Sequence, residues 1–358
     1  MSLAFHWRLP QGGERDGATR ASQATRAETA LPDLSAQVDF CRQAEQSGID
    51  SVLVDLNVAK PDPIALATAL AVRTQRVRFI VAVRSGLLSP TLFVQQINTL
   101  SALSKGRVSL NVVAGHSPAE QKSYGDFLSH GERYARTDEF LTICHGLWAC
   151  AGGVTFSGRY LRIEDGRLNA PFVSPERSSP EIFVAGNSAE SCGLAQKWGT
   201  CWMRLGDTPA RVAESVAPVL AAGVAAGLRL SIISAPTRAE ALRSAASVLD
   251  ALDASRRDRA TESAFVDRSD SVSIKQTYEL AASEWLTDCL WAGAVRSHGA
   301  TTLALVGAPD AVAAGIMEFA RAGISHFILS GWPKLESMIF FGRHILPAIR
   351  TIESAGAC

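Results

Sequence analysis

The stretch SLNVVAGHSPAEQKSYGDFLSHGERYARTDEF, residues 109–140, begins as a hydrophobic strand and breaks at Gly115. Asn111, His116 and Tyr134 belong to a set of polar side chains that it spreads through the strand, the loops and the start of a helix. In a barrel of parallel strands, chemistry collects on the loops that follow the carboxyl ends of the strands. Polar groups gathered at one such end therefore predict a site able to hold a phosphate and a polar ring.

Short apolar or β-branched runs alternate with longer Ala- and Leu-rich amphipathic runs, which is the pattern of βα units around a parallel sheet. A closed barrel needs about eight such strands. A Rossmann-type open sheet is the competing architecture, but no G-x-G-x-x-G follows any predicted strand. The sequence therefore predicts an α/β fold, a single (β/α)8 TIM barrel over residues 1–358. The predicted strands cover residues 3–7, 50–56, 78–83, 107–113, 181–185, 200–205, 228–234 and 325–330.

Two stretches predict crossover helices, because each has a proline near its start and a glycine at its end. Residues 89–106 run from Ser89-Pro90 to Gly106, and residues 308–323 repeat this design. Both are typical of the helices that connect parallel strands.

Three stretches exceed a minimal barrel and are expected to be insertions. Residues 8–34 lack periodicity and predict a long loop, and residues 154–169 alternate around Ser-Gly and Asp-Gly, which indicates a β-hairpin. Residues 253–300 begin highly charged and end mixed. Loops of this length are usually functional, so we expect a partly mobile lid there.

Composition excludes several classes of function. The chain has 35 basic and 35 acidic side chains and no Lys/Arg block, so no nucleic-acid partner is expected. Its 7 cysteines form no C-x-x-C pair or zinc-finger spacing, which indicates reduced thiols and no metal site. No apolar segment is long enough to span a membrane, and the first residues lack a signal-peptide pattern, so a soluble cytoplasmic protein is expected.

Several segments together resemble the bacterial luciferase-like flavin monooxygenases, and most closely their alkanesulfonate monooxygenase branch. They are FIVAVRSGLLSPTLFVQQINTLSALSKGRVSLNVVAGHSPAE, FLSHGERYARTDEF, FVAGNSAE, LWAGAVRSHGATTLALVGAPDAVAAGI and SHFILSGWP. The resemblance implies reduced FMN (FMNH2) supplied by a separate NAD(P)H-dependent flavin reductase, with O2 as cosubstrate. In this family a flavin C4a-peroxide oxygenates a small organic substrate, and the barrels usually pair through their helices, so a homodimer or homotetramer is expected.

The resemblance also assigns the cofactor site. It places Asn111 beside the flavin ring, and a buried amide there requires a hydrogen-bond partner. The SHGERY motif supplies His130 and Tyr134, and Tyr134 matches the tyrosine that contacts the FMN phosphate in the family. His130 has a second interpretation, as a solvated loop residue or helix cap.

In VAGNSAES, Gly186, Asn187 and Ser188 precede a predicted helix, and Ser188 is either an N-cap or a phosphate ligand. The family motif is usually Gly-Gly-Ser-Ser, from which Asn187 departs.

The substrate side is expected around Arg229. If Leu228 and Leu230 face the helices, Arg229 points into the barrel, where an arginine requires an anion or a carboxylate. The resemblance gives it the role of facing the flavin peroxide and an anionic substrate group. Ser231 stands where the alkanesulfonate enzymes have a histidine, which argues against their mechanism here.

Two further pocket positions depart from the alkanesulfonate enzymes. Lys60 stands near their cysteine, where it could meet an anion or be a surface lysine, and Trp332 replaces their tyrosine. Trp332 adds apolar area, so a larger or less polar substrate is expected. His116 could border the flavin, and Arg296 or His298 would close over the site from the family's mobile loop.

The leading interpretation is an FMNH2-dependent two-component monooxygenase acting on a small organic molecule other than a simple alkanesulfonate, such as an intermediate of specialised metabolism. Alkanesulfonate desulfonation, to aldehyde and sulfite, is the first alternative. A deazaflavin-dependent oxidoreductase is less favoured, because the motifs match the FMN branch. A non-catalytic flavin-binding protein is the alternative from a different class.

Overall fold

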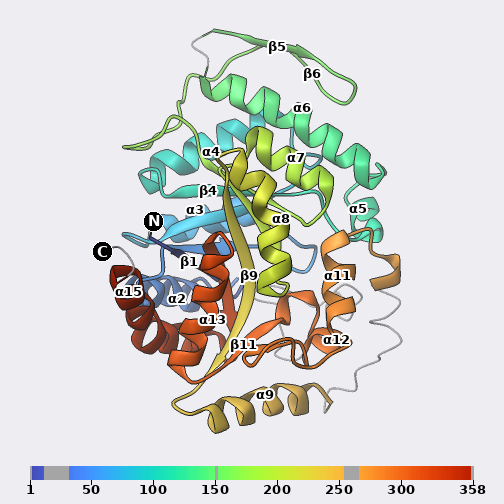
Figure 1. Cartoon of the computed structure of the whole chain (residues 1–358). Helices are drawn as coiled ribbons and strands as arrows, with labels where there is room; N and C mark the ends of the chain where they lie inside the picture. Colours follow the sequence, from blue (N-terminus) through green and yellow to red (C-terminus); the bar gives the residue numbers. More distant parts are fainter. Residues whose placement is uncertain (1, 12–31, 150–151, 254–265, 356–358) are drawn as a thin grey trace.

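Parallel strands close into a barrel at the centre of the protein (Figure 1). The computed structural model describes residues 2–11, 32–149, 152–253 and 266–355. The ring strands are β1 (Ala4–Arg8), β2 (Ser51–Val54), β3 (Arg78–Val83), β4 (Val108–Val113), β7 (Glu181–Ala185), β8 (Cys201–Leu205), β9 (Ala225–Ser234) and β12 (Ile324–Gly331). Each pairs in parallel with the next, β12 pairs with both β1 and β9, and β8 pairs with β9 to close the ring. The predicted (β/α)8 TIM barrel is confirmed.

Strand β9 begins earlier than predicted, at Ala225 instead of residue 228. The Ala-Ala-Gly sequence at its start has low strand propensity, so pattern alone places the beginning at Leu228. The neighbouring strand explains the extension, because Ala225, Ala226 and Gly227 pair with Cys201, Trp202 and Met203 of β8. A Cβ at Gly227 would lie 2.3 Å from Cε of Met203, so glycine leaves room for the end of this side chain.

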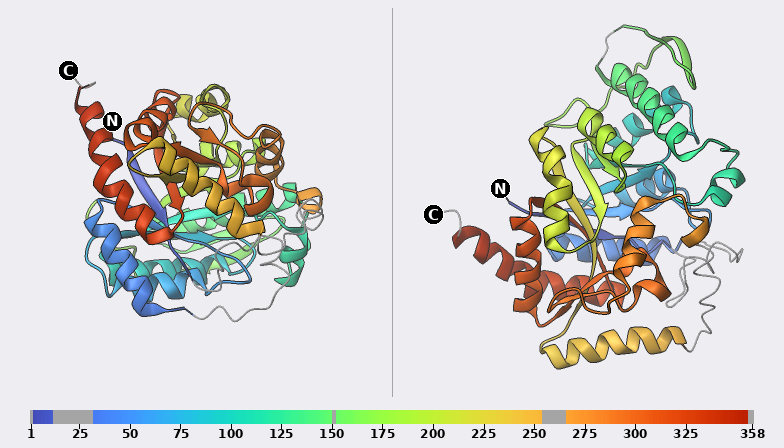
Figure 2. Two further views of the ribbon diagram at one scale, coloured as in Figure 1. Left: turned by 90° about the horizontal axis from the view of Figure 1, so that it is seen from below. Right: turned by 45° about the vertical axis from the view of Figure 1, so that its right-hand side comes forward.

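Helices cover the outside of the barrel (Figures 1 and 2). Both predicted crossover helices are present, and Ser89 caps the first by accepting a hydrogen bond from the backbone N–H of Leu92. The helices are α2 (Leu34–Gln46), α3 (Pro63–Ala71), α4 (Pro90–Ser104), α5 (Pro118–Ser123), α6 (His130–Ala149), α7 (Ala189–Trp198), α8 (Pro209–Ala221), α9 (Arg238–Asp253), α11 (Val272–Leu280), α12 (Val295–His298), η1 (Ala300–Thr302), α13 (Pro309–Arg321), α14 (Lys334–Phe340), η2 (Phe341–Ile345) and α15 (Leu346–Ala355).

A short extension of the sheet lies beside β9, and the sequence pattern did not predict it. Strand β11 (Ala304–Gly307) pairs in parallel with Ser231–Ser234, whereas β8 pairs with Ala225–Arg229. Strand β10 (Leu290–Trp291) then pairs antiparallel with β11. One edge of β9 pairs with β12 from Ala226 to Ile232, whereas its other edge pairs with β8 in the first half and with β11 in the second.

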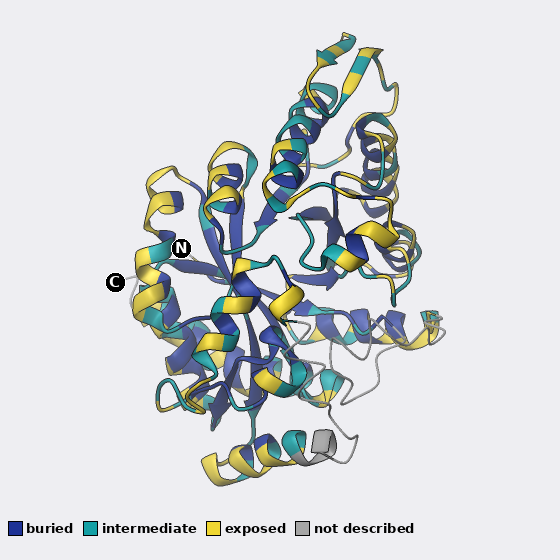
Figure 3. Cartoon of the chain, turned by 90° about the vertical axis from the view of Figure 1, so that its right-hand side faces the viewer, coloured by how far each residue is buried: buried dark blue, intermediate teal, exposed yellow. Residues whose placement is uncertain are grey.

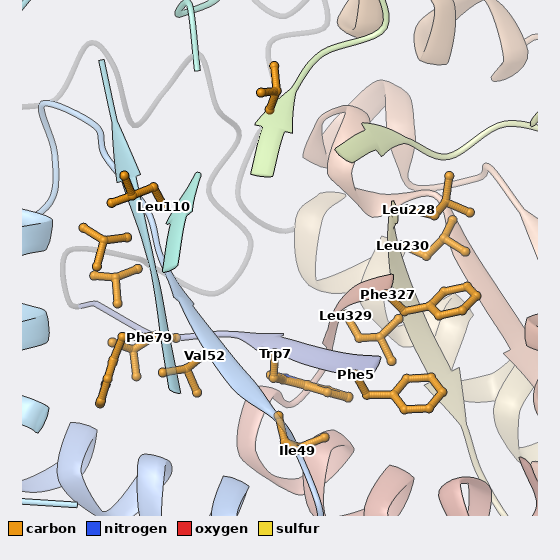
Figure 4. Packing of buried hydrophobic residues seen from close by; sticks show 14 of the residues in the cluster. Phe5, Trp7, Ile49, Val52, Phe79, Leu110, Leu228, Leu230, Phe327 and Leu329 are labelled. Carbon is orange, nitrogen blue, oxygen red and sulfur yellow. The ribbon is translucent and has the colours of Figure 1, made fainter. Parts of the chain in front are cut away.

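Apolar side chains pack in two layers, one outside and one inside the barrel. Phe5 and Trp7 of β1 and Phe327 of β12 belong to the large cluster between strands and helices (Figure 4). Figure 3 shows the strands buried and the outward faces of the helices exposed. A smaller cluster fills the barrel interior, formed by Leu53, Ile80, Phe183, Cys201, Met203 and Ile328.

Two histidines stack near the start of the barrel interior. His6 of β1 and His326 of β12 have ring centroids 5.4 Å apart at an interplanar angle of 8°, and Nε2 of His6 lies 3.1 Å from Nδ1 of His326. Phe183 packs edge-on against both rings. Burial, followed by the charge of His326, holds the pKa of His6 well below its ordinary value, and burial also lowers the pKa of His326.

The expected insertions differ in how much of them the structure describes. Strands β5 (Val154–Ser157) and β6 (Arg162–Gly166) pair antiparallel in a two-stranded sheet outside the barrel, at the top of Figure 1. Most of the loop expected over 8–34, and the start of the segment 253–300, lie outside the described residues. None of the described helices is both long and apolar enough to cross a membrane.

Candidate active site

A cavity of about 290 Å³ opens at the carboxyl ends of the barrel strands. Its floor is the inner apolar layer, because Leu53, Met203 and Ile328 belong to both. This volume is at the lower end of those typical for small-molecule sites, and the position is the one at which TIM-barrel enzymes carry their chemistry. Most of the predicted site residues line it, namely Lys60, Asn111, His116, His130, Tyr134, Gly186, Asn187, Ser188, Arg229, His298 and Trp332.

One end of the cavity is lined by hydroxyl groups. Tyr134 of α6 is 8% exposed, and its hydroxyl group interacts with those of Ser188 and Ser191. Burial raises the pKa of Tyr134 and these two hydrogen bonds oppose the shift, so its hydroxyl stays protonated and can donate. We call Tyr134, Ser188 and Ser191 the hydroxyl end. Tyr134 and Ser188 line the cavity and are neutral donors of the kind that bind oxyanions. Ser191 is fully buried beside them, and its hydroxyl donates to the carbonyl oxygen of Ser188 at 2.7 Å.

Gly186 keeps the hydroxyl end open. Its φ of 147° lies in the range that favours glycine, and a Cβ there would lie 2.9 Å from Oη of Tyr134 and 2.9 Å from Cβ of Ser191. Ser188 then begins α7 as its N-cap, since its Oγ accepts a hydrogen bond from the backbone N–H of Ser191 at 3.2 Å. The turn therefore directs a helix N-terminus toward the space beside Tyr134.

Asn111 and His130 present buried polar atoms to the same cavity. Within the described part of the chain, Oδ1 of Asn111 has no hydrogen-bond partner, and neither ring nitrogen of His130 has one. The ring of His130 packs against Tyr134, and its Nδ1 lies 3.9 Å from Oδ1 of Asp270. Buried polar atoms usually have partners, so these atoms indicate where a polar ligand would bind.

Asn187 has a bridging position in this structure. Its Oδ1 accepts a hydrogen bond from the backbone N–H of Leu205, and its Nδ2 donates to Oε1 of Gln276, each at 3.1 Å. The side chain thereby links β8 to α11. This explains why an asparagine suits a position at which the family motif usually differs.

The opposite end of the cavity carries a cluster of charges around Asp55, which directly follows β2. Its Oδ2 accepts from Nε of Arg8 at 2.6 Å and from Nζ of Lys60 at 2.7 Å, and Nη1 of Arg229 lies 3.7 Å from Oδ1. We call Arg8, Asp55, Lys60 and Arg229 the cationic end. Burial opposes ionisation of Asp55, but the charges of Lys60, Arg8 and Arg229 together hold its pKa well below its usual range.

Gln11 fixes the backbone of Asp55. Its Oε1 accepts from the Asp55 backbone N–H at 2.8 Å, and its Nε2 donates to the Asp55 carbonyl oxygen at 2.9 Å. Gln11 is itself fully buried. Gln11 thus holds the backbone of Asp55 in place, while the surrounding cations hold its carboxylate.

Several charged residues that line the cavity were not predicted from the sequence, namely Arg8, Asp55, Arg84, Arg204 and Lys334. Arg84 pairs with Glu120 of α5 at 2.8 Å and is 4% exposed in its side chain. Their position in the sequence could have identified four of these residues as site residues. Arg8, Asp55, Arg84 and Arg204 all lie at or just after the carboxyl ends of barrel strands.

Two predicted site residues, Ser231 and Arg296, are not among the residues that line the cavity. Ser231 is fully buried, and its hydroxyl donates to the carbonyl oxygen of Thr301 at 2.9 Å, because η1 covers that part of β9. Arg296 is exposed, and its Nε donates to the carbonyl oxygen of Ala281 at 2.9 Å. Of the pair expected to close over the site, His298 lines the cavity, with its ring centroid 6.1 Å from that of Trp332.

Part of the expected lid packs directly onto the cavity. Asp270 accepts from Nη2 of Arg133 at 2.5 Å, and Oγ of Ser269 donates to the carbonyl oxygen of His116 at 2.7 Å. Ser271, Val272, Ser273 and Ile274 complete the lining. Arg133, which the sequence places beside Tyr134, therefore holds this segment against the barrel.

Among the described residues, no group of three or more His, Cys, Asp and Glu side chains is arranged to hold a metal ion. The cysteines described as free include Cys41, Cys144 and Cys201, all buried. Burial raises the pKa of Cys41 to about 12. The polar groups that line the cavity are hydroxyl, amide, imidazole, carboxylate, guanidinium and ammonium groups.

Solved structures of several other proteins superpose on nearly the whole of this chain. A riboflavin lyase solved with modified FMN and its substrate riboflavin superposes with a TM-score of 0.79 at 23% identity, over 99% of this chain and 92% of that one. EDTA monooxygenase from Chelativorans sp. BNC1 gives 0.77 at 21% identity, over 98% and 94%. An F420-dependent secondary alcohol dehydrogenase in complex with an F420-acetone adduct gives 0.66 at 18%, over 98% and 99%.

At these identities the solved structures show a shared barrel. The sequence shows the family as well as the fold, because the family model for luciferase-like monooxygenases matches residues 12–326. This range includes the hydroxyl end, the cationic end apart from Arg8, and every barrel strand except the first and part of the last. The chain belongs to the luciferase-like monooxygenase family.

Proposed function

We propose that this protein is a two-component monooxygenase that uses reduced FMN from a separate NAD(P)H-dependent flavin reductase, together with O2, to oxygenate a small organic anion. The observation that carries the proposal is a single cavity with a neutral hydroxyl end and a cationic end, over an apolar floor. One molecule with a phosphate and a polar ring suits the first end and the floor. A second, anionic molecule suits the other.

The residues present fit a reduced flavin. The hydroxyl end, beside the N-terminus of α7, would hold the phosphate, and the unpartnered Oδ1 of Asn111 would accept from a ring N–H. Reduced FMN, when bound, supplies the electrons that activate O2. Met203 and Ile328 would exclude water beneath the ring, which strengthens the polar interactions above it.

The cationic end supports an anionic substrate. Arg229 is 14% exposed in its side chain and faces the cavity from β9, while Lys60 reaches it from the loop after β2. In such a partly dry site, fixed positive charges stabilise negative charge far better than water does. Arg229 would orient the substrate, and Trp332 would supply apolar contact for its carbon frame.

Alkanesulfonate desulfonation is the second candidate, because the same cationic end would accept a sulfonate. The buried position of Ser231 and the bulk of Trp332 favour a larger organic anion over a short alkanesulfonate. An F420-type cofactor is the competing choice on this fold. Its phosphate would also suit the hydroxyl end, so the cofactor must be tested directly.

An oxygen-electrode assay tests the proposal. The protein is mixed with FMN, NADH and a flavin reductase, or with reduced F420 in a parallel assay, then given panels of alkanesulfonates, larger organic carboxylates and sulfonates, and their neutral analogues. We expect oxygenated product, detected by mass spectrometry, to appear with FMN and only from anionic substrates. Product formation with reduced F420 but not with reduced FMN would contradict the proposal, as would binding of reduced FMN without turnover of any substrate panel.

A further inference from the structure

Arg204 is a buried arginine whose hydrogen-bonding capacity the protein itself does not fill. Its side chain is 4% exposed and lines the cavity, yet its Nε and Nη1 have no hydrogen-bond partner within the described residues. Asp207 lies 3.8 Å from its Nη2, at the outer limit of an ion pair. Burying a guanidinium with unmet donors is costly, so such a group indicates an anionic ligand.

The strand register places Arg204 beside Gly186. Ala185 of β7 pairs with Met203 of β8, and the backbone N–H of Gly186 continues the ladder by donating to the Met203 carbonyl oxygen at 3.0 Å. The next neighbours are therefore Gly186 and Arg204, and neighbouring residues of parallel strands project to the same face. On that face, Gly186 leaves the space beside the Tyr134 hydroxyl.

Trp202 independently links Arg204 to the hydroxyl end. It precedes Arg204 by two residues and so shares its face of β8. The indole Nε1 of Trp202 donates to Oγ of Ser191 at 3.2 Å, and Cζ of Arg204 lies 5.9 Å from the centroid of the Trp202 ring. The guanidinium therefore lies on the same side of the sheet as the α7 N-terminus.

We propose that Arg204 binds the terminal phosphate of the cofactor, together with the hydroxyl groups of Tyr134 and Ser188. A phosphate monoester has three terminal oxygens and a double negative charge, which suits donors that converge from a guanidinium, hydroxyl groups and a helix N-terminus. Burial lowers the pKa of Arg204 more than Asp207 restores it, so a bound dianion would favour its charged form. This inference rests on the proposed flavin cofactor, and it adds a cation beside the hydroxyl groups of Tyr134 and Ser188, where Glu190 is the nearby anion.

Paired titrations with FMN and riboflavin, which differ by the phosphate, test the inference. Under anaerobic conditions, wild-type protein should bind reduced FMN at least about tenfold more tightly than reduced riboflavin, the effect of a charge-assisted contact. Arg204→Met should reduce that ratio by about tenfold or more and leave riboflavin affinity within about threefold. Arg229→Met, at the cationic end, is the matched control and should preserve the ratio.

Several outcomes would overturn the inference. An unchanged ratio in Arg204→Met would do so, as would loss of the ratio in Arg229→Met, which would place the phosphate at the cationic end. If Arg204→Met does not fold, Arg204→Lys replaces it and should lower the ratio, so an unchanged ratio there counts equally against the inference.

Equal binding of the two flavins by the wild type, with thermal stabilisation by inorganic phosphate alone, would also overturn the inference and would mean a free-phosphate site. Absence of binding by both flavins would overturn the inference and the proposed function together.

Discussion

At the scale of single residues, Arg229 illustrates how a side chain can be placed correctly while its environment is missed. The alternation of Leu228, Arg229 and Leu230 predicts that the arginine points inward, and both leucines are fully buried on the other face. Its carboxylate partner could not be predicted from the sequence, because Asp55 lies far away in the chain. Contacts between distant strand ends depend on barrel closure, which no local pattern encodes.

Arg229→Ala should impair oxygenation far more than flavin binding. Arg229 pairs with Asp55 at the cationic end, and in its absence Asp55 would keep Arg8 and Lys60 as partners. We expect a fall of about 10²-fold in single-turnover oxygenation, comparable to removal of one electrostatic stabiliser, and FMN affinity within a few-fold of wild type. Rapid-mixing kinetics would measure the first and fluorescence titration the second. Full activity would mean that Arg229 is a structural ion-pair partner.

Asp55→Asn should destabilise the protein in a pH-dependent way. Removing the carboxylate leaves several cations close together, at a cost of about 3 kcal/mol in unfolding free energy at pH 7. Because the folded-state pKa of Asp55 is depressed, its contribution is complete above the unfolded value of about 3.9 and is lost as pH falls below it. Urea unfolding at several pH values should therefore show the two proteins converging in acid.

A matched control for this experiment is Asp39→Asn, since Asp39 forms an exposed ion pair with Arg42. Its effect should stay below about 0.5 kcal/mol. A deficit in Asp55→Asn that does not diminish below pH 4 would show that the loss comes from packing and hydrogen bonding instead of charge.

At the scale of elements, strands that pass through the core were predictable and the short extension was not. Long apolar runs bounded by turn residues locate all the ring strands. Strand β11, by contrast, spans four residues directly before the proline of α13, so its apolar run merges with the helix pattern. Its strand conformation follows from pairing with the second half of β9, which is a tertiary contact.

Asp270→Asn should loosen the segment that carries α11. The Arg133–Asp270 pair ties this segment to α6, and a hydrogen bond between charged groups contributes about 1.5–3 kcal/mol. If tryptic cleavage after Arg268 follows local opening, its rate should rise about tenfold or more, and reduced FMN should slow it. Asp288→Asn, an exposed change in the same region, is the control and should leave the rate unchanged. Equal cleavage rates in the wild type, Asp270→Asn and Asp288→Asn would show that this ion pair does not hold the segment against the barrel.

At the scale of the whole molecule, the first and last ring strands are joined inside and outside the barrel. His6 and His326 stack between β1 and β12, while Arg350 of α15 donates to the carbonyl oxygen of Leu3 at 2.9 Å. Figure 2 shows both termini at the same end of the molecule. Closure of the ring is therefore stabilised by residues from the two extremes of the sequence.

The histidine pair should make the protein sensitive to mild acid. Both folded-state pKa values are lowered, so the folded protein keeps the rings neutral while the unfolded chain takes up protons below about pH 6.5. Stability should thus fall as pH decreases from 6.5, by up to about 1.4 kcal/mol per pH unit for each histidine. Chemical denaturation at pH 5, 6 and 7 would measure this slope, and His6→Gln should reduce it. An unchanged slope in that variant would assign the acid sensitivity elsewhere.

The shared strand β9 also limits how this protein can be shortened. Its backbone groups from Ser231 onward are satisfied by β11, and β11 is in turn covered by β10. Trimming the long insertion past Gly299 far enough to remove β11 would expose an open strand edge, and such edges recruit strands from other chains. A shortened protein of that kind would aggregate through intermolecular pairing even though every barrel strand was intact.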